Sequence, residues 1–403
     1  MYIYKAAVIG AGTMGAQIAQ VISYSGLPVV LKDRDQQAVD RGLAAIRKIY
    51  QGRVDKGKMT ASEMEQKLAL VSGTTTYDGF KDVDIVIEAV YEDLKVKRQV
   101  FSDLEGVCSP STILATNTSS LPISAIAVGT KRPDKVVGMH FFNPAHVMKL
   151  VEVIPGLPTS SETVDDVVAF SESLRKIPVR VQDCAGFLVN RLLMPYLNEA
   201  ALALQEGAAT AKQMDEAMVA LGMPMGPFAL LDMIGIDVAE KVAHILYDAY
   251  GPRMTAATIL DELVKAKRFG AKNGVGFYNY QGVKDDTLEQ LVAKVQKQGS
   301  YKKTRFTPER LLLILINEAV ICLQEGVASA GDIDIAMVAG TGFPQDKGGP
   351  LHLADQMGID FVLQGLETFK QELGPRFWPA HMLKRMVAAG YFGKKSGKGF
   401  FTY

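Results

Sequence analysis

A glycine-rich turn near the N-terminus constrains the fold of this 403-residue chain more than any other feature. The turn has the pattern G-x-G-x-x-G; it follows an apolar run at residues 3–9 and precedes a helical pattern at 16–25. In a strand–turn–helix unit, the glycines allow a tight turn and a close approach of a pyrophosphate, and the helix N-terminus faces the phosphates. The pattern therefore predicts a dinucleotide-binding α/β unit. The residues expected at the cofactor are Gly10, Gly12, Thr13, Met14 and Gly15.

The acidic residue after the next predicted strand indicates which dinucleotide binds. Asp33 ends an apolar run at 28–32 and lies 23 residues beyond Gly10. A carboxylate there can accept hydrogen bonds from both hydroxyls of the adenosine ribose, and it would repel a 2′-phosphate. The neighbouring Arg34 is an opposing signal, because an arginine near this position can bind that phosphate. We expect NAD rather than NADP.

Polar residues follow the ends of two further predicted strands. Glu92 and Lys97 come after the apolar run at 83–89, and Ser119 follows the next apolar run. Because ligands of a doubly wound sheet bind beyond the carboxyl ends of its strands, these three side chains should line one crevice. The alternative for Ser119 and the adjacent Ser120 is capping of a following helix, and the sequence does not separate the two roles.

Residues 138–154 are where we expect the chemistry to take place. Two apolar runs flank a break at Asn143-Pro144, a pattern typical of two strands joined by a short turn. The fold-back would bring His140 and Glu152 onto neighbouring strands. If the side chains face each other, the carboxylate selects the imidazole tautomer and raises its proton affinity, which makes a general base near neutral pH. A core histidine and an edge glutamate that never meet fit this stretch equally well.

A locally basic segment follows the second predicted strand. Residues 35–67 indicate two polar helices, and Arg53 and Lys58 are among the cations near the break between them. A charge run of this kind is usually a solvated helical face, and the functional alternative is a landing site for a phosphorylated substrate. Elsewhere, His146 and Lys149 are polar residues of the 138–154 stretch to which no role is assigned.

The second half of the chain contains one helical unit written twice. Residues 198–207 (NEAALALQEG) recur as 317–326 (NEAVICLQEG), and each copy closes with a similar glycine-rich tail. We expect the copies to bury apolar faces on each other, as a pseudo-dimer within one chain. Three domains are predicted: an NAD-binding domain at 1–183, a helical copy one at 184–281, and a polar linker with a structural copy two at 282–403.

The two copies differ at the start of their first helix. Asn190 opens this helix in copy one, whereas Glu309 occupies the aligned position in copy two. Only copy one directly follows the nucleotide-binding domain in the chain. We therefore expect Asn190 to face the substrate crevice and copy two to be structural.

Taken together, these motifs resemble the L-3-hydroxyacyl-CoA dehydrogenases of fatty-acid β-oxidation. Besides the glycine turn, the resemblance rests on 88–97 (EAVYEDLKVK), 138–144 (GMHFFNP), 150–154 (LVEVI) and 186–191 (GFLVNR). The duplicated unit looks like the dehydrogenase portion of the large multifunctional β-oxidation proteins, without their hydratase half. The resemblance implies an α/β Rossmann-type doubly wound sheet, followed by two all-α helical repeat domains similar to the C-terminal domain of 6-phosphogluconate dehydrogenase.

The resemblance also implies a role for each matched position. His140 would be the general base and Glu152 its orienting partner, while Ser119 and Asn190 would bond the 3-oxygen of the substrate or the nicotinamide region. The implied cofactor is NAD, and the CoA phosphates would meet the basic segment. The further cofactor contacts would come from Asp33, Glu92, Lys97, Asn143 and Lys272, and those to the substrate from Asn143, Arg53 and Lys58.

The reaction implied is oxidation of a (3S)-3-hydroxyacyl-CoA to the 3-oxoacyl-CoA, with a hydride passing from C3 to NAD+ and the hydroxyl proton to His140. One candidate substrate is 3-hydroxybutyryl-CoA. Two alternatives stay open: a dehydrogenase of a non-CoA hydroxy compound on the same scaffold, and a catalytically silent NAD-binding assembly subunit. The intact set of His140, Glu152, Ser119 and Asn190 argues against the second.

Composition narrows the partners and the compartment. Lys+Arg and Asp+Glu number 44 each, so no net field attracts nucleic acid or an anionic membrane. A strand predicted from residue 3 leaves no room for a signal peptide, and three scattered cysteines (Cys108, Cys184, Cys322) indicate a reducing compartment, so we expect a cytoplasmic protein. The five histidines show no ligand spacing, and no metal is expected. An enoyl-CoA hydratase or thiolase partner, and a monomer or homodimer, fit the resemblance.

Overall fold

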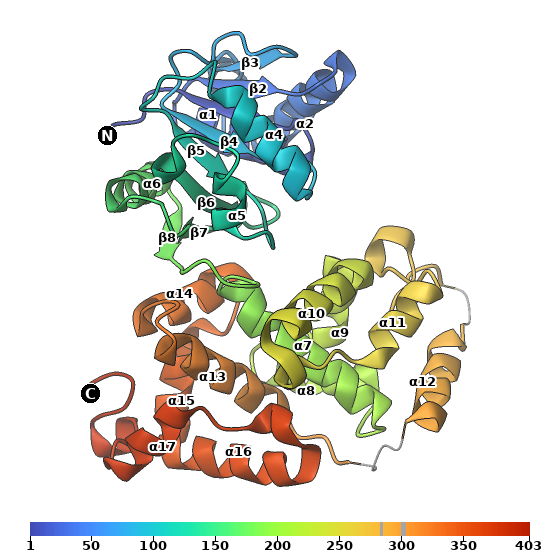
Figure 1. Cartoon of the computed structure of the whole chain (residues 1–403). Helices are drawn as coiled ribbons and strands as arrows, with labels where there is room; N and C mark the ends of the chain where they lie inside the picture. The colour runs from blue at the N-terminus through green and yellow to red at the C-terminus, as the bar shows by residue number, and fades with distance from the viewer. Residues whose placement is uncertain (283–284, 300–303) are drawn as a thin grey trace. The chain divides into compact units, whose positions relative to one another are not determined.

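The computed structural model describes residues 1–282, 285–299 and 304–403. Two compact units make up the chain in Figure 1, unit 1 (Met1–Phe187) and unit 2 (Leu188–Tyr403). Part of the predicted linker, at 283–284 and 300–303, lies outside the described residues, and between these two gaps the chain forms helix α12 (Thr287–Gln298). In the described ranges, no helix combines the length and apolar character that a membrane span requires.

Unit 1 is a doubly wound α/β fold, as predicted. Its sheet has the strand order β3-β2-β1-β4-β5-β6-β7-β8, and every neighbouring pair is parallel except β6–β7. The central strands β1, β4 and β5 are short, mostly apolar and buried, which is usual for a parallel sheet covered by helices on both faces. The strands are β1 (Ala6–Ile9), β2 (Val29–Lys32), β3 (Val71–Thr74), β4 (Ile85–Glu88), β5 (Ile113–Thr116), β6 (Val136–Phe141), β7 (Leu150–Pro155) and β8 (Ile177–Arg180).

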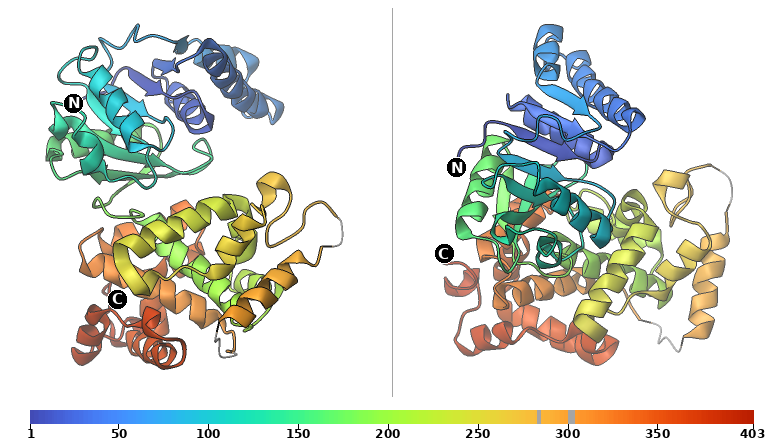
Figure 2. Two further views of the ribbon diagram at one scale, coloured as in Figure 1. Left: turned by 45° about the vertical axis from the view of Figure 1, so that its right-hand side comes forward. Right: turned by 45° about the horizontal axis from the view of Figure 1, so that its top comes forward.

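Several helices of unit 1 begin at residues that satisfy their first N–H groups. Asp35 caps α2 and Asp93 caps α4, and Thr60 with Glu63 forms a capping box at α3. Helices α2 and α3 (blue in Figure 2) are the two polar helices predicted at 35–67, and α2 packs beside the edge strand β3. The helices are α1 (Thr13–Tyr24), α2 (Gln36–Asp55), α3 (Ala61–Leu68), α4 (Leu94–Leu104), α5 (Ile123–Ala127) and α6 (Ser161–Ser173).

The fold-back predicted at 138–154 is the antiparallel pair β6–β7. Its register places His140 directly opposite Glu152. Because β6 runs parallel to β5, His140 lies towards the carboxyl edge of the sheet. The glycine turn after β1 lies at the same edge, where ligands of doubly wound sheets bind.

Unit 2 repeats one arrangement of five helices, in agreement with the repeat in the sequence. In each copy a buried carboxylate accepts backbone N–H groups of the closing tail: Asp232 accepts from Phe277 at 2.8 Å, and the equivalent Asp355 accepts from Phe400 at 3.0 Å. Copy one consists of α7 (Val189–Gln205), α8 (Ala211–Ala220), α9 (Pro227–Ile234), α10 (Ile236–Tyr250) and α11 (Thr258–Lys265). Copy two consists of α13 (Pro308–Gln324), α14 (Ala330–Thr341), α15 (Pro350–Met357), α16 (Ile359–Leu373) and α17 (His381–Ala388).

The two copies pack against each other through their first helices, α7 and α13. Two equivalent arginines, both buried, reach across this contact to glutamates of the opposite copy. The arrangement is symmetric, because each arginine pairs with the same two positions of the opposite copy. The contacts are Arg191 to Glu318 and Glu325, and Arg310 to Glu199 and Glu206, at 2.6–2.8 Å.

Candidate active site

The two residues expected to carry the chemistry do face each other. Nδ1 of His140 lies 2.7 Å from Oε2 of Glu152, and both side chains are buried. In neutral histidine an Nδ1–H that donates to this carboxylate leaves Nε2 as the nitrogen that accepts a proton. The rings of Phe142 and Phe187 lie 4.6 and 5.8 Å from the imidazole centre, so the pair has apolar neighbours.

Glu92 organises the loop that follows β5. Its Oε1 accepts from the Thr118 hydroxyl at 2.6 Å, the Ser119 N–H at 2.9 Å and the Ser120 hydroxyl at 3.1 Å. Burial by itself would raise the pKa of Glu92, but the Lys97 ammonium and the hydrogen bonds from the loop outweigh it and hold that pKa below its ordinary value. The capping alternative for the two serines does not hold, because α5 begins after Pro122 without a side-chain cap.

Lys97 is buried, and its ammonium lies between the carboxylates of Glu88 and Glu92. Its side chain is 1% exposed, and its ammonium lies 2.8 Å from Oε1 of Glu88 and 3.2 Å from Oε2 of Glu92. Thr116 donates to the other Glu88 oxygen at 2.6 Å. The geometry therefore connects Lys97 to the crevice through Glu92. Sequence reasoning missed Glu88, although a glutamate at the end of an otherwise apolar strand was a usable signal.

The glycine turn has the features that a pyrophosphate requires. Gly10 has a φ of +104°, and a side chain there would collide with the Ala89 carbonyl. Within the described residues, nothing lies within 4 Å of a Cβ placed on Gly12, and no side chain caps α1, whose first turn also lacks an acidic residue. Asp33 accepts the Ala11 N–H at 2.7 Å, which braces the turn. The residues present therefore fit a bound dinucleotide.

Two arginines of unit 1, Arg53 and Arg175, stack on the ring of Tyr24, at 4.5 and 5.9 Å from its centre. Arg53, in the last turn of α2, donates to the Tyr24 hydroxyl at 2.7 Å and stacks over its ring. Lys176 donates to the carbonyls of Ala145 and Met148, on either side of His146, and burial with the charges of Lys176 and Arg53 lowers the pKa of His146. Lys58 lies in the exposed turn after α2. The sequence offered no sign of Lys176, and His146 had no assigned role.

Two predicted site residues belong to unit 2. Asn190 lies half-buried in the first turn of α7. The Lys272 ammonium pairs with Asp237, and the equivalent Lys395 pairs with Asp360 at 2.6 Å. Because this ion pair occurs in both copies, it supports a structural role in the tail of each, and the cofactor contact of Lys272 stays a prediction.

A carboxylate–histidine cluster in copy one was not expected from the histidine spacing. Glu240, His244 and Asp261 bring their ligand atoms within 4.8 Å of one another, and His244 lies 2.9 Å from Asp261. In copy two the equivalents of His244 and Asp261 are Glu367 and Lys384, which form an ion pair at 3.1 Å. The contact between these two helices is therefore kept in both copies, with the acidic and basic positions exchanged. This supports a structural role for the cluster, which holds the two helices together.

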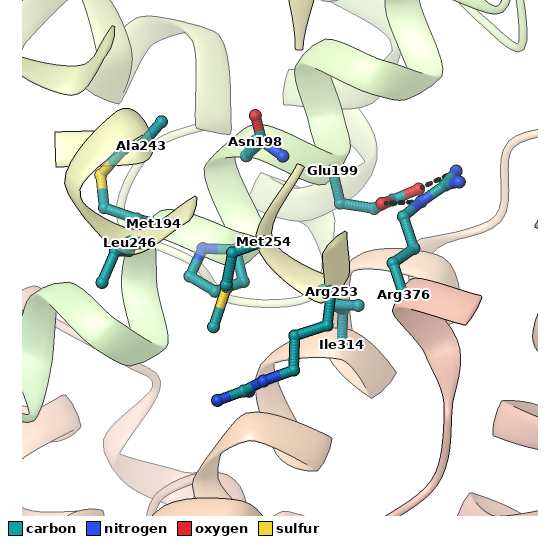
Figure 3. Close-up of a pocket in the computed structure, with 10 residues that line it drawn as sticks. Met194, Asn198, Glu199, Ala243, Leu246, Arg253, Met254, Ile314 and Arg376 are labelled. Atoms are coloured by element: carbon teal, nitrogen blue, oxygen red, sulfur yellow. Dashed lines mark hydrogen bonds and ion pairs between the residues drawn. The ribbon is translucent and has the colours of Figure 1, made fainter. Parts of the chain in front are cut away.

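The cavity drawn in Figure 3 lies within unit 2, where the copies meet, beside the Glu199–Arg376 pair. Pro195 and its equivalent Ile314 both line it. Its volume of about 20 Å³ suffices for roughly one water molecule. This cavity is too small for an acyl group or a nucleotide, and the candidate active site remains at the carboxyl edge of the sheet in unit 1.

A glycine turn fitted to a pyrophosphate, with a His–carboxylate pair on the same sheet edge, is the arrangement of a nicotinamide-dependent dehydrogenase. The family model for the NAD-binding domain of 3-hydroxyacyl-CoA dehydrogenase matches residues 5–184, and the model for its C-terminal domain matches 186–280 and 306–403. The chain belongs to the 3-hydroxyacyl-CoA dehydrogenase family, and NAD is its cofactor.

Relatives of known name agree with this assignment. The chain is 43% identical over 394 residues to the fatty acid oxidation complex subunit alpha of Shewanella amazonensis, covering 96% of this chain and 55% of that protein. The chain thus spans about half the length of the curated relatives it matches. A crystal structure of 3-hydroxybutyryl-CoA dehydrogenase from Escherichia coli superposes with a TM-score of 0.88 at 33% identity, over 97% of this chain and all of that one. The (S)-3-hydroxybutyryl-CoA dehydrogenase from Ralstonia eutropha is 41% identical over 70% of this chain and all of its own, with a TM-score of 0.68.

Proposed function

We propose that this chain oxidises (3S)-3-hydroxyacyl-CoA to 3-oxoacyl-CoA with NAD+, and that 3-hydroxybutyryl-CoA is one of its substrates. The observation that carries the proposal is the 2.7 Å contact between His140 and Glu152 at the sheet edge that bears the glycine turn. The names of two similar solved structures, both 3-hydroxybutyryl-CoA dehydrogenases, support the choice of substrate.

His140 acts as the general base in this proposal. Nε2 takes the proton of the substrate 3-hydroxyl, and in the reverse direction the imidazolium returns it to the ketone oxygen. NAD+, when bound, supplies the hydride acceptor. Glu152 holds the ring by its Nδ1–H and stabilises the imidazolium, in a buried environment that strengthens the ion pair. General base catalysis of this kind contributes about 100- to 10,000-fold.

The hydrogen bonds from Ser119 to Glu92 support a role for Ser119 in the reaction. Because Glu92 accepts from both the backbone and the side chains of the 118–120 loop, the loop has little freedom to move. In the proposal, the hydroxyl of Ser119 bonds the 3-oxygen of the substrate, and Asn190 is a further residue that binds the substrate. Lys97 contributes by holding Glu92 in place.

The CoA phosphates bind at the basic segment in this proposal. Arg53 and Lys176 bring positive charge to one region of unit 1, and burial lowers the pKa of Lys176 to about 8. Lys58, in the turn after α2, adds a further cation. Phosphate dianions would neutralise this charge, whereas a free hydroxy acid would not reach it.

One experiment separates the proposed function from its alternatives. Purified chain is given NADH with acetoacetyl-CoA or with free acetoacetate, and NADH oxidation is followed. NADH oxidation with acetoacetyl-CoA but not with free acetoacetate supports the proposal. Equal rates with the free acid would favour a dehydrogenase of non-CoA hydroxy compounds, and NADH binding without any oxidation would favour a non-catalytic subunit.

A larger assembly is also proposed. The curated relatives are named as subunit alpha of a fatty acid oxidation complex and are about twice as long as this chain. We infer that, in the cytoplasm, an enoyl-CoA hydratase partner supplies the 3-hydroxyacyl-CoA substrate or a thiolase partner consumes the 3-oxoacyl-CoA product. Co-purification from the source cell, followed by identification of the bound proteins, tests this inference.

A further inference from the structure

The turn between β6 and β7 presents Asn143, and side chains from outside the turn hold its backbone. Gln17, on α1, accepts the Ala145 N–H through Oε1 at 2.6 Å. Lys176 donates to the carbonyls of Ala145 and Met148, the latter at 2.7 Å. The turn is therefore bound to the nucleotide-binding helix on one side and to the start of β8 on the other.

The bond to Ala145 decides which way the Gln17 amide points. A backbone N–H can only donate, so the oxygen of Gln17 faces Ala145 and its nitrogen lies at the other end. That nitrogen, Nε2, lies 3.4 Å from Oδ1 of Asn143. An amide nitrogen does not accept hydrogen bonds, so this contact turns the Asn143 oxygen towards Gln17 and its NH2 group away.

At 3.4 Å this contact is too long to add much stability, but it selects between the two flipped orientations of the Asn143 amide. Asn143 is exposed and lies three residues beyond His140, just after the end of β6 that carries the candidate base. Gln17 lies two residues beyond Gly15, on the helix that begins at the glycine turn. Gln17 is half-buried, whereas its contact with Asn143 lies at the surface.

We propose that Gln17 is a positioning residue that makes Asn143 a hydrogen-bond donor to the bound ligand. The acceptor is a carbonyl-type oxygen, either the carboxamide oxygen of nicotinamide or a carbonyl oxygen of the acyl substrate. The identity of these ligands rests on the proposed function above. The orientation of the amide follows from the contacts of Gln17 alone.

Two substitutions of Gln17 separate orientation from simple loss of contact. Gln17→Glu keeps an acceptor for Ala145 but sets a second oxygen against Asn143, which reverses the Asn143 amide and turns its oxygen to the ligand. Gln17→Met removes both bonds, so the Asn143 amide can adopt either orientation. We expect Gln17→Glu to lower the affinity for the ligand that Asn143 contacts by about tenfold or more. Gln17→Met should lower the same affinity by only about two- to threefold.

The same two substitutions in an Asn143→Ala background test whether the effect passes through Asn143. The rival explanation is that the new glutamate acts by repelling the phosphates of the cofactor, and such an effect would persist without Asn143. We expect both Gln17 variants to have nearly the affinities of Asn143→Ala alone, as a double-mutant cycle requires of coupled residues. Unchanged melting temperatures exclude misfolding as the cause.

The readouts are Kd for NADH by fluorescence titration and KM and kcat for acetoacetyl-CoA. A raised NADH Kd alone supports nicotinamide as the acceptor, and a changed KM or kcat alone supports the acyl substrate. Wild-type values in Gln17→Glu, or an equal effect in the Asn143→Ala background, would overturn the assignment. If the wild type binds NADH but turns over no thioester, the proposed function fails and the acyl substrate is excluded as the acceptor. The NADH Kd then decides the role of Gln17 alone, and an unchanged value in Gln17→Glu would overturn it.

Discussion

At the scale of single residues, the chemistry depends on what surrounds one imidazole. His140 lies opposite Glu152 in the β6–β7 register, and both side chains are withdrawn from water. A carboxylate in this position restrains the ring and favours one tautomer, because it accepts only from a protonated nitrogen. The proton-accepting nitrogen is then the one directed away from Glu152.

Replacing His140 by Gln should lower kcat by about 100- to 10,000-fold, because the amide cannot accept the hydroxyl proton. Affinity for NADH should change little, since the glycine turn and Asp33 are untouched. Steady-state rates and NADH fluorescence titrations measure the two quantities. His381→Gln, at the exposed start of α17, is the matched control. Turnover of His140→Gln close to that of the control would contradict the base assignment.

At the scale of elements, buried charges hold the ends of β4 and β5 in place. Glu88 is fully buried at the end of β4, and Lys97 of α4 and Thr116 of β5 both bond to it. Lys97 also reaches Glu92, which in turn binds the 118–120 loop. One lysine thus connects a strand, a helix start and the candidate active-site loop.

Lys97→Met should destabilise unit 1 by about 3–5 kcal/mol, because it leaves the Glu88 carboxylate buried without its cation. Chemical denaturation, followed by a probe in unit 1, measures the loss. The double variant Lys97→Met with Glu88→Gln removes the stranded charge and should recover a large part of the stability. A loss under about 1 kcal/mol in the single variant would show that the pair is not desolvated as described.

The contact between α10 and α11 should depend on pH, whereas its equivalent in copy two should not. The hydrogen bond to Asp261 raises the pKa of His244 from its ordinary value of 6.5, although slight burial opposes it. A histidine whose pKa is higher in the folded state stabilises the fold fully at pH values below its ordinary pKa. This stabilisation is lost as the pH rises through the pKa of the folded state.

His244→Gln should therefore lower the melting temperature at pH 5.5 and leave it unchanged at pH 9. Glu367→Gln, at the equivalent position of copy two, breaks an ion pair with Lys384 and should have the same small effect at both pH values. Both shifts should shrink at high salt, because the sites are partly exposed. A pH-independent effect of His244→Gln would contradict this account of the tie.

At the scale of the whole chain, a duplicated helical unit forms its own partner. The arginines at the starts of α7 and α13 each pair with glutamates of the opposite copy, so the charges cross the contact in both directions. Arg253 and its equivalent Arg376 join the same two clusters. Separation of the copies would expose apolar helices and leave both clusters without partners.

Arg310→Met should destabilise unit 2 by about 1–3 kcal/mol, because the buried carboxylates of Glu199 and Glu206 would lose one cation and keep only Arg376. Arg191→Met should have a similar effect from the other side. The control is Arg180→Met, which breaks an exposed ion pair with Asp165 in unit 1. Its free energy of unfolding should fall by at most about 1 kcal/mol, and denaturation curves compare the three variants. Equal losses in all three variants would mean that the crossed clusters do not hold the copies together.

The sequence by itself determined those features whose residues lie close together in the chain. The glycine turn, the fold-back at 138–154 and the repeat each appear as a local pattern of residue types. Glycines at a strand end, apolar runs around a break and a recurring decapeptide constrain the backbone directly, so the doubly wound sheet and the two helical copies could be predicted. The pairing of His140 with Glu152 could be predicted only as one of two outcomes, because strand register depends on the turn.

The tertiary structure alone decided which distant side chains meet. Glu92 binds a loop 26–28 residues away, Gln17 binds a turn 128 residues away, and Arg191 pairs with Glu318 across 127 residues. For the same reason Lys97, predicted to touch the cofactor, lies buried between two glutamates. Such contacts depend on which strands are neighbours and which helix faces turn inward. A local pattern of residues carries no information on that order, since it arises when the whole chain buries its apolar surface.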